Sequence, residues 1–426
     1  MRRELGRGAF GRVLLAEAKI DNKLYALKII SKQSIRTNAD KTQAKAERDI
    51  LHAMSYSNPH PFTSGLKFAF QSENNLYLGM DFLPGGNLRE LIKRHKVLPE
   101  KWVQFYSSEL VLALAHLHSI NVLYRDIKPH NVMIDGKGHV IIIDFGLSKW
   151  DRENYKNKDR AMSLVGTPDY SAPEVLRTGV YQIEKKRQSS DYNAKTGYKN
   201  KRSKEPDDEN YGYGKAADWW SLGIMIYEML SGTPAFRGAD LRQTYQKVLF
   251  SELEFKPIDL FSDSAKALLI GLLDRIPETR LGSGKNSPQD IKSAQFFKGV
   301  DWNRVFSRAD DGPWIPEPVV FRRKSNQETT NEMKNNQNEL NDGGNVAQND
   351  VQPNRNESID ITEPMNTGSV SNVTMQMRES IFSSSMTNNG NKLQGWSFFD
   401  EQALANAIEK NNDEHEKEVK IQQLLL

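Results

Sequence analysis

Tyr124-Arg125-Asp126-Ile127-Lys128-Pro129-His130-Asn131 and, shortly after it, Asp144-Phe145-Gly146 are the stretches that decide the fold of this 426-residue chain. Two short aliphatic runs joined by a Gly-Lys-Gly turn lie between them and predict a β-hairpin. That hairpin brings Asp126, Asn131 and Asp144 to one rim. Phosphoryl transfer from ATP needs a carboxylate at the attacking hydroxyl, and a carboxylate and an amide oxygen to hold Mg²⁺, so the spacing fits that chemistry.

These residues resemble the catalytic and metal-binding loops of the eukaryotic protein kinases, and Tyr124 in place of the usual His resembles the AGC group. The resemblance implies a two-lobed α+β fold, with a small β-rich lobe and a larger helical lobe, and the cofactors ATP and Mg²⁺. It implies that Asp126 accepts the hydroxyl proton and that Lys128, as in Ser/Thr kinases, contacts the transferring phosphate. Asn131 and Asp144 are the implied Mg²⁺ ligands. A loop of turn-forming polar residues is the plainer interpretation.

A glycine-rich segment, Gly6-Arg7-Gly8-Ala9-Phe10-Gly11-Arg12-Val13, lies near the beginning of the chain. A strand pattern follows it, whereas a dinucleotide-binding fold would place a helix there, so a kinase phosphate loop is favoured. By resemblance, Lys28 on the next strand contacts the α- and β-phosphates. Its expected partner is Glu47 rather than Asp49, although either acid alone is also explained as a surface charge on an amphipathic helix.

The same resemblance implies a larger set of nucleotide contacts. They are Gly6, Arg7, Gly8, Ala9, Phe10, Gly11, Val13, Ala26, Lys28, Met80, Asp81, Leu83, Asn87 and Met133. Leu88 is expected to join the apolar residues that sandwich the adenine, but ordinary core packing explains those residues equally well. Strands are expected around His60-Pro61-Phe62 and from Asn75 onward.

The segment after Asp144 resembles the AGC activation segment, in which the phosphorylated residue stands three before Gly-Thr-Pro; here that residue is Ser163. A phosphate there adds a charge of roughly −1.5 to −2, which can pair with Arg125 and Lys149. An unmodified hydroxyl in a loop is the alternative. The implied structural residues are Arg125, Lys149, Thr167, Glu174, Asp218 and Arg280, with Glu174 paired to Arg280 and Asp218 bracing the catalytic loop.

The predicted organisation is a kinase domain over 1–300, followed by an AGC-type extension over 301–426. The small lobe is expected over 1–83 and the large lobe over 84–300. Within the extension, 393–399 resembles the AGC hydrophobic motif with a phosphorylated Ser397, or else forms an amphipathic patch. Three further segments are expected: a polar insertion at 180–211, which is a solvated segment or a nuclear-targeting or docking loop, a low-complexity region at 325–391 and a helix at 402–426.

Many AGC kinases use several acids to select arginine before the phosphoacceptor. Two of those acids are replaced in this chain, by Asn87 and by His130, whereas Glu228 is kept. An amide lacks the charge of a carboxylate, and a charge-assisted hydrogen bond is about twice as strong as a neutral one. Weaker selection of arginine is therefore expected.

Bulk composition bounds the remaining possibilities. The chain has no cysteine, which excludes disulfides and thiol chemistry, and its net charge of +3 does not favour nucleic acid as a partner. No apolar run is long enough to span a membrane. A monomer is expected, with a cytoplasmic location or, alternatively, a nuclear one.

The sequence thus predicts an ATP-dependent Ser/Thr protein kinase that acts on protein substrates and is activated by an upstream kinase. A catalytically weak kinase-like scaffold is the alternative. Because only a few residues precede the glycine-rich segment, an internal or misassigned start at Met1 is also expected.

Overall fold

The computed structural model describes residues 3–8, 11–18, 23–151, 161, 165–181, 213–317, 396 and 398–399. Residues 1–316 and 373–426 belong to one compact unit, and 317–372 form another, of which only Glu317 is described. Several predicted features lie outside the described residues: Ala9, Phe10, Ser163, Ser397, most of the 180–211 insertion, the low-complexity region and the 402–426 helix.

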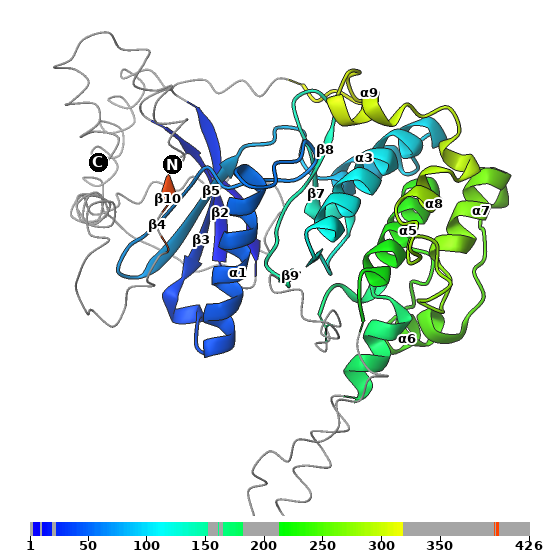
Figure 1. Ribbon diagram of the computed structural model, residues 1–426, viewed down its shortest axis with the longest axis horizontal. Coiled ribbons are helices and arrows are strands. Elements are labelled where there is room, and N and C mark those ends of the chain that lie inside the picture. The colour runs from blue at the N-terminus through cyan, green and yellow to red at the C-terminus, as the bar shows by residue number, and fades with distance from the viewer. Residues whose placement is uncertain are drawn as a thin grey trace, which may run out of the picture. The chain divides into compact units, whose positions relative to one another are not determined.

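An antiparallel six-stranded sheet forms the small lobe, in the order β1-β2-β3-β5-β4-β10. Its strands are β1 (Arg3–Gly8), β2 (Gly11–Glu17), β3 (Leu24–Ser31), β4 (Phe68–Gln71), β5 (Asn75–Asp81) and β10 (Phe398–Phe399). β10 comes from near the end of the chain and pairs with β4 at the edge of the sheet. Figure 1 shows this sheet and α1 (Asn38–Ser55) on one side of the molecule and most helices on the other.

Alternating burial explains how the sheet packs. Side chains of a strand point to opposite faces in turn, so Ile30, Leu76 and Leu78 join the main core with Ile50 and Leu51 of α1. A smaller cluster packs on the other face. Its members are Leu14, Leu27, Ile29, Phe70 and Tyr77.

The start of α1 is fixed by a capping box between Thr37 and Asp40. The Asp40 backbone N–H donates to Thr37 Oγ1 over 3.1 Å, and the Thr37 backbone N–H donates to Asp40 Oδ2 over 2.8 Å. These bonds satisfy backbone donors that a helix start leaves without partners. The helix therefore begins at a defined residue, which sets where its acidic side chains lie.

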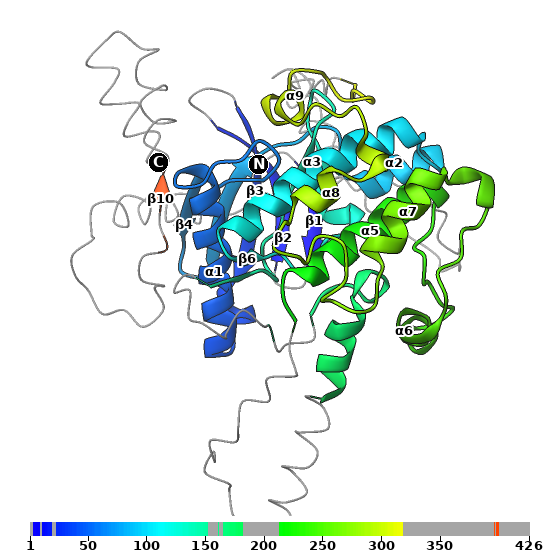
Figure 2. The ribbon, with the colours of Figure 1, turned by 45° about the vertical axis from the view of Figure 1, so that its right-hand side comes forward.

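Helices dominate the large lobe, as Figures 1 and 2 show. They are α2 (Leu88–His95), α3 (Glu100–Ser119), α5 (Ala216–Ser231), α6 (Leu241–Phe250), α7 (Asp263–Leu272), α8 (Gln289–Lys292), α9 (Trp302–Ser307) and a helix over 173–181. The 3₁₀ turns are η1 (Lys32–Ser34), η2 (Pro129–Asn131), η3 (Pro168–Tyr170), η4 (Ile258–Leu260) and η5 (Gln295–Phe297). Two small ladders complete the lobe, β6 (Val122–Leu123) with β9 (Lys149–Trp150) and β7 (Val132–Ile134) with β8 (Val140–Ile142).

The centre of the large lobe is α5, which packs against both α3 and α7. Nearly all of its residues are buried, and it ends at Gly232, whose φ of 84° is one that a glycine adopts without strain. Among the described residues, no helix is long and apolar enough to cross a membrane. The predicted two-lobed α+β fold is confirmed.

The strand expected around His60-Pro61-Phe62 is wrong. Those residues form a turn, and the strand of this region is β4, at Phe68–Gln71. Pro61 has no backbone N–H to donate to a ladder, and the Phe62 N–H donates to His60 Nδ1 over 3.3 Å. The local side-chain bond therefore favours a turn over sheet pairing.

Candidate active site

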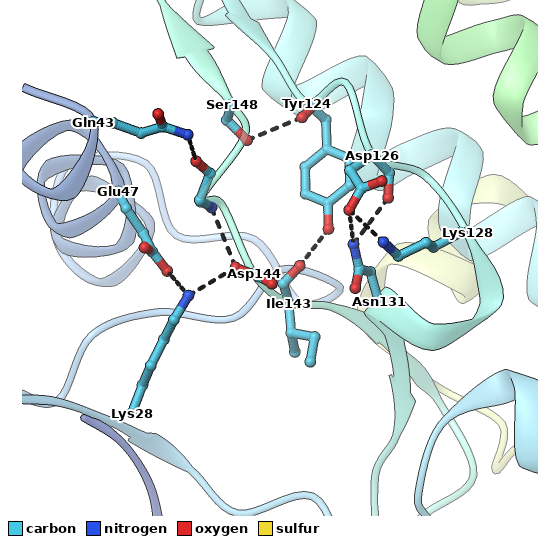
Figure 3. A network of polar contacts seen from close by, with 11 residues as sticks. Lys28, Gln43, Glu47, Tyr124, Asp126, Lys128, Asn131, Ile143, Asp144 and Ser148 are labelled. Carbon is cyan, nitrogen blue, oxygen red and sulfur yellow. Dashed lines mark hydrogen bonds and ion pairs between the residues drawn. The ribbon is translucent and has the colours of Figure 1, made fainter. Parts of the chain in front are cut away.

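An ion-pair cluster, half-buried overall, lies where the two lobes meet (Figure 3). Lys28 Nζ on β3 is 2.5 Å from Glu47 Oε1 on α1 and 2.9 Å from Asp144 Oδ1, which follows β8. Asp49, the alternative partner, instead pairs with its neighbour Arg48. The geometry thus selects Glu47, and Lys28 connects an acid of each lobe.

Electrostatics keep Lys28 and Asp144 ionised. Burial by itself lowers the pKa of Lys28, but the carboxylates of Glu47 and Asp144 outweigh it and raise that pKa above its ordinary value. For Asp144, burial raises the pKa, but Lys28, the Gly146 N–H and Lys128 together outweigh it, so the net shift is downward. Burial raises the pKa of Glu47, which the Lys28 ammonium opposes. A charged lysine therefore faces a charged Asp144 at neutral pH.

The catalytic loop holds Asp126 in a second network. Asp126 Oδ2 accepts from Lys128 Nζ over 2.7 Å and from Asn131 Nδ2 over 2.7 Å, while Thr167 Oγ1 donates to Asp126 Oδ1 over 3.1 Å. Lys128 Nζ also donates to Thr167 Oγ1 over 2.9 Å. The ammonium, the carboxylate and the amide expected from the sequence thus lie together, and Thr167 joins the activation segment to them.

Asp218 on α5 braces this loop from behind. Its carboxylate accepts from the backbone N–H of Tyr124 over 3.0 Å and from that of Arg125 over 2.8 Å, and His118 Nε2 lies 2.8 Å from Asp218 Oδ2. Tyr124, whose hydroxyl donates to the Ile143 carbonyl, ties the loop to β8. In Figure 3, the bond from Tyr124 to Ile143 lies between the group around Lys28 and the group around Asp126.

Two residues of the site adopt a backbone conformation that non-glycine residues rarely take. Arg125 has a φ of 69° and Asp144 a φ of 60°. Such conformations cost of order 1–3 kcal/mol and persist where the surroundings impose them. Here the Asp218 bonds hold Arg125, whereas Asp144 Oδ1 is held by Lys28 and by the Gly146 N–H, 3.3 Å away.

Four of the residues expected to contact the nucleotide, Val13, Ala26, Lys28 and Met80, share one face of the sheet. Val13 is the cross-strand partner of Lys28, and Ala26 is that of Met80, with Ala26 and Lys28 two residues apart on β3. These side chains are all partly exposed. They therefore form an accessible wall above the catalytic loop.

The glycine-rich segment belongs to the same sheet, where Gly6, Arg7 and Gly8 of β1 pair with the start of β2. At Gly11 an added Cβ would lie 1.8 Å from the Ile29 carbonyl oxygen, so only glycine fits against β3.

A backbone hinge follows β5. Asp81, at the end of β5, pairs with Tyr25 and is exposed, and Leu83 is partly exposed. The Gly85 N–H donates to the Ile134 carbonyl over 2.9 Å, which ties the hinge to β7. An isolated bridge also pairs Asn87 with Met133. Leu88 corrects the sequence prediction: it is fully buried in the core and does not line an accessible surface.

The structural residues lie in and beside the core of the large lobe. Arg280 and Glu174 form a buried bidentate pair, with Nη1 to Oε1 at 2.6 Å and Nη2 to Oε2 at 2.9 Å. Arg125 Nε donates to the Leu147 carbonyl over 2.6 Å, and Lys149 pairs with Leu123 in the β6–β9 ladder. Arg125 lies two residues after β6 and Lys149 lies on its partner strand β9, so the two residues come from neighbouring segments.

Three groups were missed by the sequence reasoning. Gln43 on α1 donates to the Gly146 carbonyl, and Arg89 with Tyr170 binds Glu228. Only the position of Arg89, two residues after Asn87, could have indicated a site residue. Its partner lies far along the chain, and no local pattern connects them.

Near the end of the chain, Trp396 is buried against the small lobe. Its Nε1 donates to the Phe70 carbonyl over 3.1 Å, and the Arg48 guanidinium lies 5.5 Å from the ring centroid. In the hydrophobic-motif interpretation Trp396 is the second anchor, and Leu393, at the position of the first, lies outside the described residues. Trp396 therefore connects the C-terminal extension with α1, the helix that carries Glu47.

Comparison with known proteins agrees with this geometry. The protein kinase domain family matches residues 1–195 and 202–297. Human ribosomal protein S6 kinase alpha-3 is 37% identical over 316 residues, which cover 73% of this chain and 37% of the relative. Serine/threonine protein kinase ypkA of Aspergillus fumigatus is 35% identical over 325 residues, which cover 76% of this chain and 45% of the relative.

The chain thus spans less than half the length of each of these relatives. The family match nevertheless covers well over half of the chain, and it includes both lobes and every described residue of the two polar networks. The chain belongs to the protein kinase family and, within it, is related to the AGC kinases.

Proposed function

We propose that the chain is a Ser/Thr protein kinase that transfers the γ-phosphate of Mg-ATP to hydroxyl groups of protein substrates. The observation that carries this proposal is the pair of adjoining networks, Lys28 with Glu47 and Asp144, and Asp126 with Lys128 and Asn131. A scaffold needs no such convergence of charges. Phosphoryl transfer needs all of them in place.

In this mechanism Asp126 accepts the proton of the attacking hydroxyl as its oxygen bonds to the γ-phosphorus. The bond from that phosphorus to the β–γ bridging oxygen breaks, and ADP leaves. Lys128, 2.7 Å from Asp126, stabilises the charge on the transferring group, and Lys28 holds the α- and β-phosphates. Glu47 positions Lys28 for this contact, since their ion pair fixes the ammonium.

Asn131 and Asp144 would hold Mg²⁺. A carboxylate and an amide oxygen are hard donors that suit this ion, and the Asp144 side chain is 46% exposed, so the residues fit it. When bound, Mg²⁺ neutralises charge on the phosphates. The chain supplies the two ligands from neighbouring segments, because the Ile143 N–H donates to the Asn131 carbonyl over 3.0 Å.

Activation would occur at Ser163, by an upstream kinase. A phosphate there would pair with Arg125 and Lys149, whose positions beside the catalytic loop support this role. Phosphorylation of Ser397, next to the buried Trp396, would add to the docking of the tail. A monomer, and a cytoplasmic location with the nucleus as the alternative, stay predictions.

One experiment tests these proposals. Purified chain, phosphorylated at Ser163, is incubated with Mg-ATP and Ser- or Thr-containing peptides, beside Asp126→Asn and Ser163→Ala variants. We expect kcat to fall by about 10²–10⁴-fold in Asp126→Asn, because the proton acceptor is lost, and by about tenfold or more in Ser163→Ala.

Asp259→Asn, an exposed acid on η4, is the control and should keep full activity. Absence of transfer by the phosphorylated wild type would favour the kinase-like scaffold instead. Undiminished activity of Ser163→Ala would remove the activation proposal alone.

A further inference from the structure

Glu228 on α5 is a fully buried carboxylate with both oxygens occupied. Arg89 Nη1, from the first turn of α2, donates to Oε1, and the Tyr170 hydroxyl, from η3, donates to Oε2. The Arg89 side chain is 20% exposed, whereas that of Glu228 is not exposed at all. The carboxylate is therefore neutralised from within the chain.

This group lies on the side of the site where a peptide must approach. Thr167, which donates to Asp126, immediately precedes the η3 turn that carries Tyr170. On the other side, α2 lies against η2, the turn that directly follows Lys128. The acceptor hydroxyl must reach Asp126, so residues beside it in the peptide pass over Arg89 and its neighbours.

The accessible charges of this surface are mostly positive. Lys93 stands four residues after Arg89, on the same face of α2, and is exposed. Lys128, the residue before η2, adds a third cation beside α2. The opposing charges are Asp169, which is partly exposed near Glu228, and Glu90, which is exposed next to Arg89.

We propose that this surface selects substrates with an anionic side chain close to the acceptor hydroxyl, from Asp, Glu or a phosphorylated residue, and that Arg89 determines the preference. The proposal rests on the proposed kinase function. A substrate arginine would find the Glu228 carboxylate already bound and would meet like charges, whereas an anion would meet Arg89 and Lys93.

The test is a positional peptide library around a fixed Ser, with Ala, Asp, phosphoserine or Arg placed at each of several flanking positions. We expect kcat/KM for Asp or phosphoserine to exceed that for Ala by about three- to tenfold at one or more positions. Arg should fall below Ala there. The Asp and phosphoserine arms distinguish the two sources of the negative charge.

Variants assign the preference to Arg89. Arg89→Ala should bring the Asp-to-Ala ratio of kcat/KM close to one and should raise the ratio for Arg, because Glu228 becomes free to bind a substrate cation. Arg89→Ala with Glu228→Gln removes both charges, so it should lose the preference for Asp without gaining one for Arg. Arg242→Ala, an exposed arginine on α6, should leave every ratio unchanged.

A purely structural defect would lower kcat/KM for all peptides alike and would leave the ratios intact. Turnover with a preference for Arg, with no preference, or with an unaltered ratio in both Arg89 variants would overturn the inference and leave the kinase function standing. If the phosphorylated wild type turned over no peptide, the inference would fall together with that function.

Discussion

At the scale of single residues, the environment of a side chain sets its chemistry. His60 is packed against His116, with ring centroids 4.7 Å apart in a stacked arrangement, and Phe62 approaches its edge. Burial in the first place, and the neighbouring His116 in the second, lower the pKa of His60 to about 3. The folded chain therefore keeps His60 neutral at pH values where an unfolded histidine is charged.

This shift predicts loss of stability in mild acid. Below an ordinary histidine pKa of about 6.5 the unfolded chain binds a proton that folded His60 does not, so the free energy of unfolding falls as the pH drops from about 6.5 towards 3. At pH 5 the loss from His60 reaches about 2 kcal/mol. Urea denaturation at pH 7.5 and pH 5.0 should show a smaller loss in His60→Gln than in the wild type.

His95→Gln provides the matched control, because His95 is exposed on α2. Its loss between the two pH values should equal that of the wild type. Equal losses in all three proteins would contradict the assignment to His60.

Residue identity alone did not determine which acid binds Lys28. Glu47 and Asp49 are two residues apart on one helix, and such positions face different sides, so the rotation of α1 decides between them. The family pattern selected Glu47 correctly. The same pattern failed for Leu88, because an apolar residue next to a site fits a ligand wall and a core equally well.

At the scale of elements, the Arg280–Glu174 pair joins the helix over 173–181 to the segment after α7. Arg280 also donates to the Ala216 carbonyl over 2.8 Å and to the Asp274 carbonyl over 2.8 Å, and its guanidinium lies 5.2 Å from the Trp220 ring centroid. One buried cation thus connects three parts of the large lobe. A charge buried this deeply is tolerated because it makes four hydrogen bonds, two of them to a carboxylate.

Breaking the Arg280–Glu174 pair should lower the stability of the folded chain. We expect Arg280→Met to lower the free energy of unfolding by about 3–5 kcal/mol, because Glu174 is left as a buried, unpaired charge. Glu174→Gln in the same chain should recover part of that loss. Urea denaturation of both single variants and the double variant gives the coupling energy.

Arg304→Met is the control, since Arg304 pairs with Asp310 and both side chains are more than half exposed, at 56% and 60%. That change should cost much less than the change at Arg280, because solvent screens an exposed ion pair. A loss at Arg280 no larger than the loss at Arg304 would refute the role of the buried pair.

Sequence patterns predicted long elements better than short ones. α3 has an apolar periodicity and α5 a near-continuous apolar run, patterns that are typical of buried helices, and both helices are largely buried. β4 has only four residues, too few for an alternation of apolar and polar side chains to be recognised. The strand of this region was therefore expected around Pro61, where the chain forms a turn. β10 has two residues and depends wholly on a partner strand distant in sequence.

At the scale of the whole molecule, the site exists only where the lobes meet. Lys28 comes from the small lobe and Asp144 from the large one, so their 2.9 Å contact is a contact between lobes. Catalytic motifs were visible in the sequence because each is a compact local run. The Arg89–Glu228 bond was not visible in the sequence, since most of the large lobe lies between α2 and α5 along the chain. The bond depends on how these two helices pack.

Nucleotide and metal together should stabilise the folded chain at the site between the lobes. A ligand that binds only the folded chain adds about 2.7 kcal/mol of stability at one hundred times its Kd, so Mg-ATP should raise Tm by several degrees. Much of that rise should require Mg²⁺ in the wild type, because Asp144 would hold the ion against the phosphates. In Asp144→Asn, the rise should be nearly the same with Mg²⁺ as with a chelator.

Thermal scans with ATP and Mg²⁺, with ATP and chelator, and with Mg²⁺ alone measure this difference within each variant. The comparison therefore does not depend on the stability that Asp144→Asn loses through its broken contact with Lys28. Asp259→Asn should keep the wild-type dependence on Mg²⁺, because Asp259 is an exposed residue of η4. A Mg²⁺-dependent rise of wild-type size in Asp144→Asn would show that the ion is held by other residues.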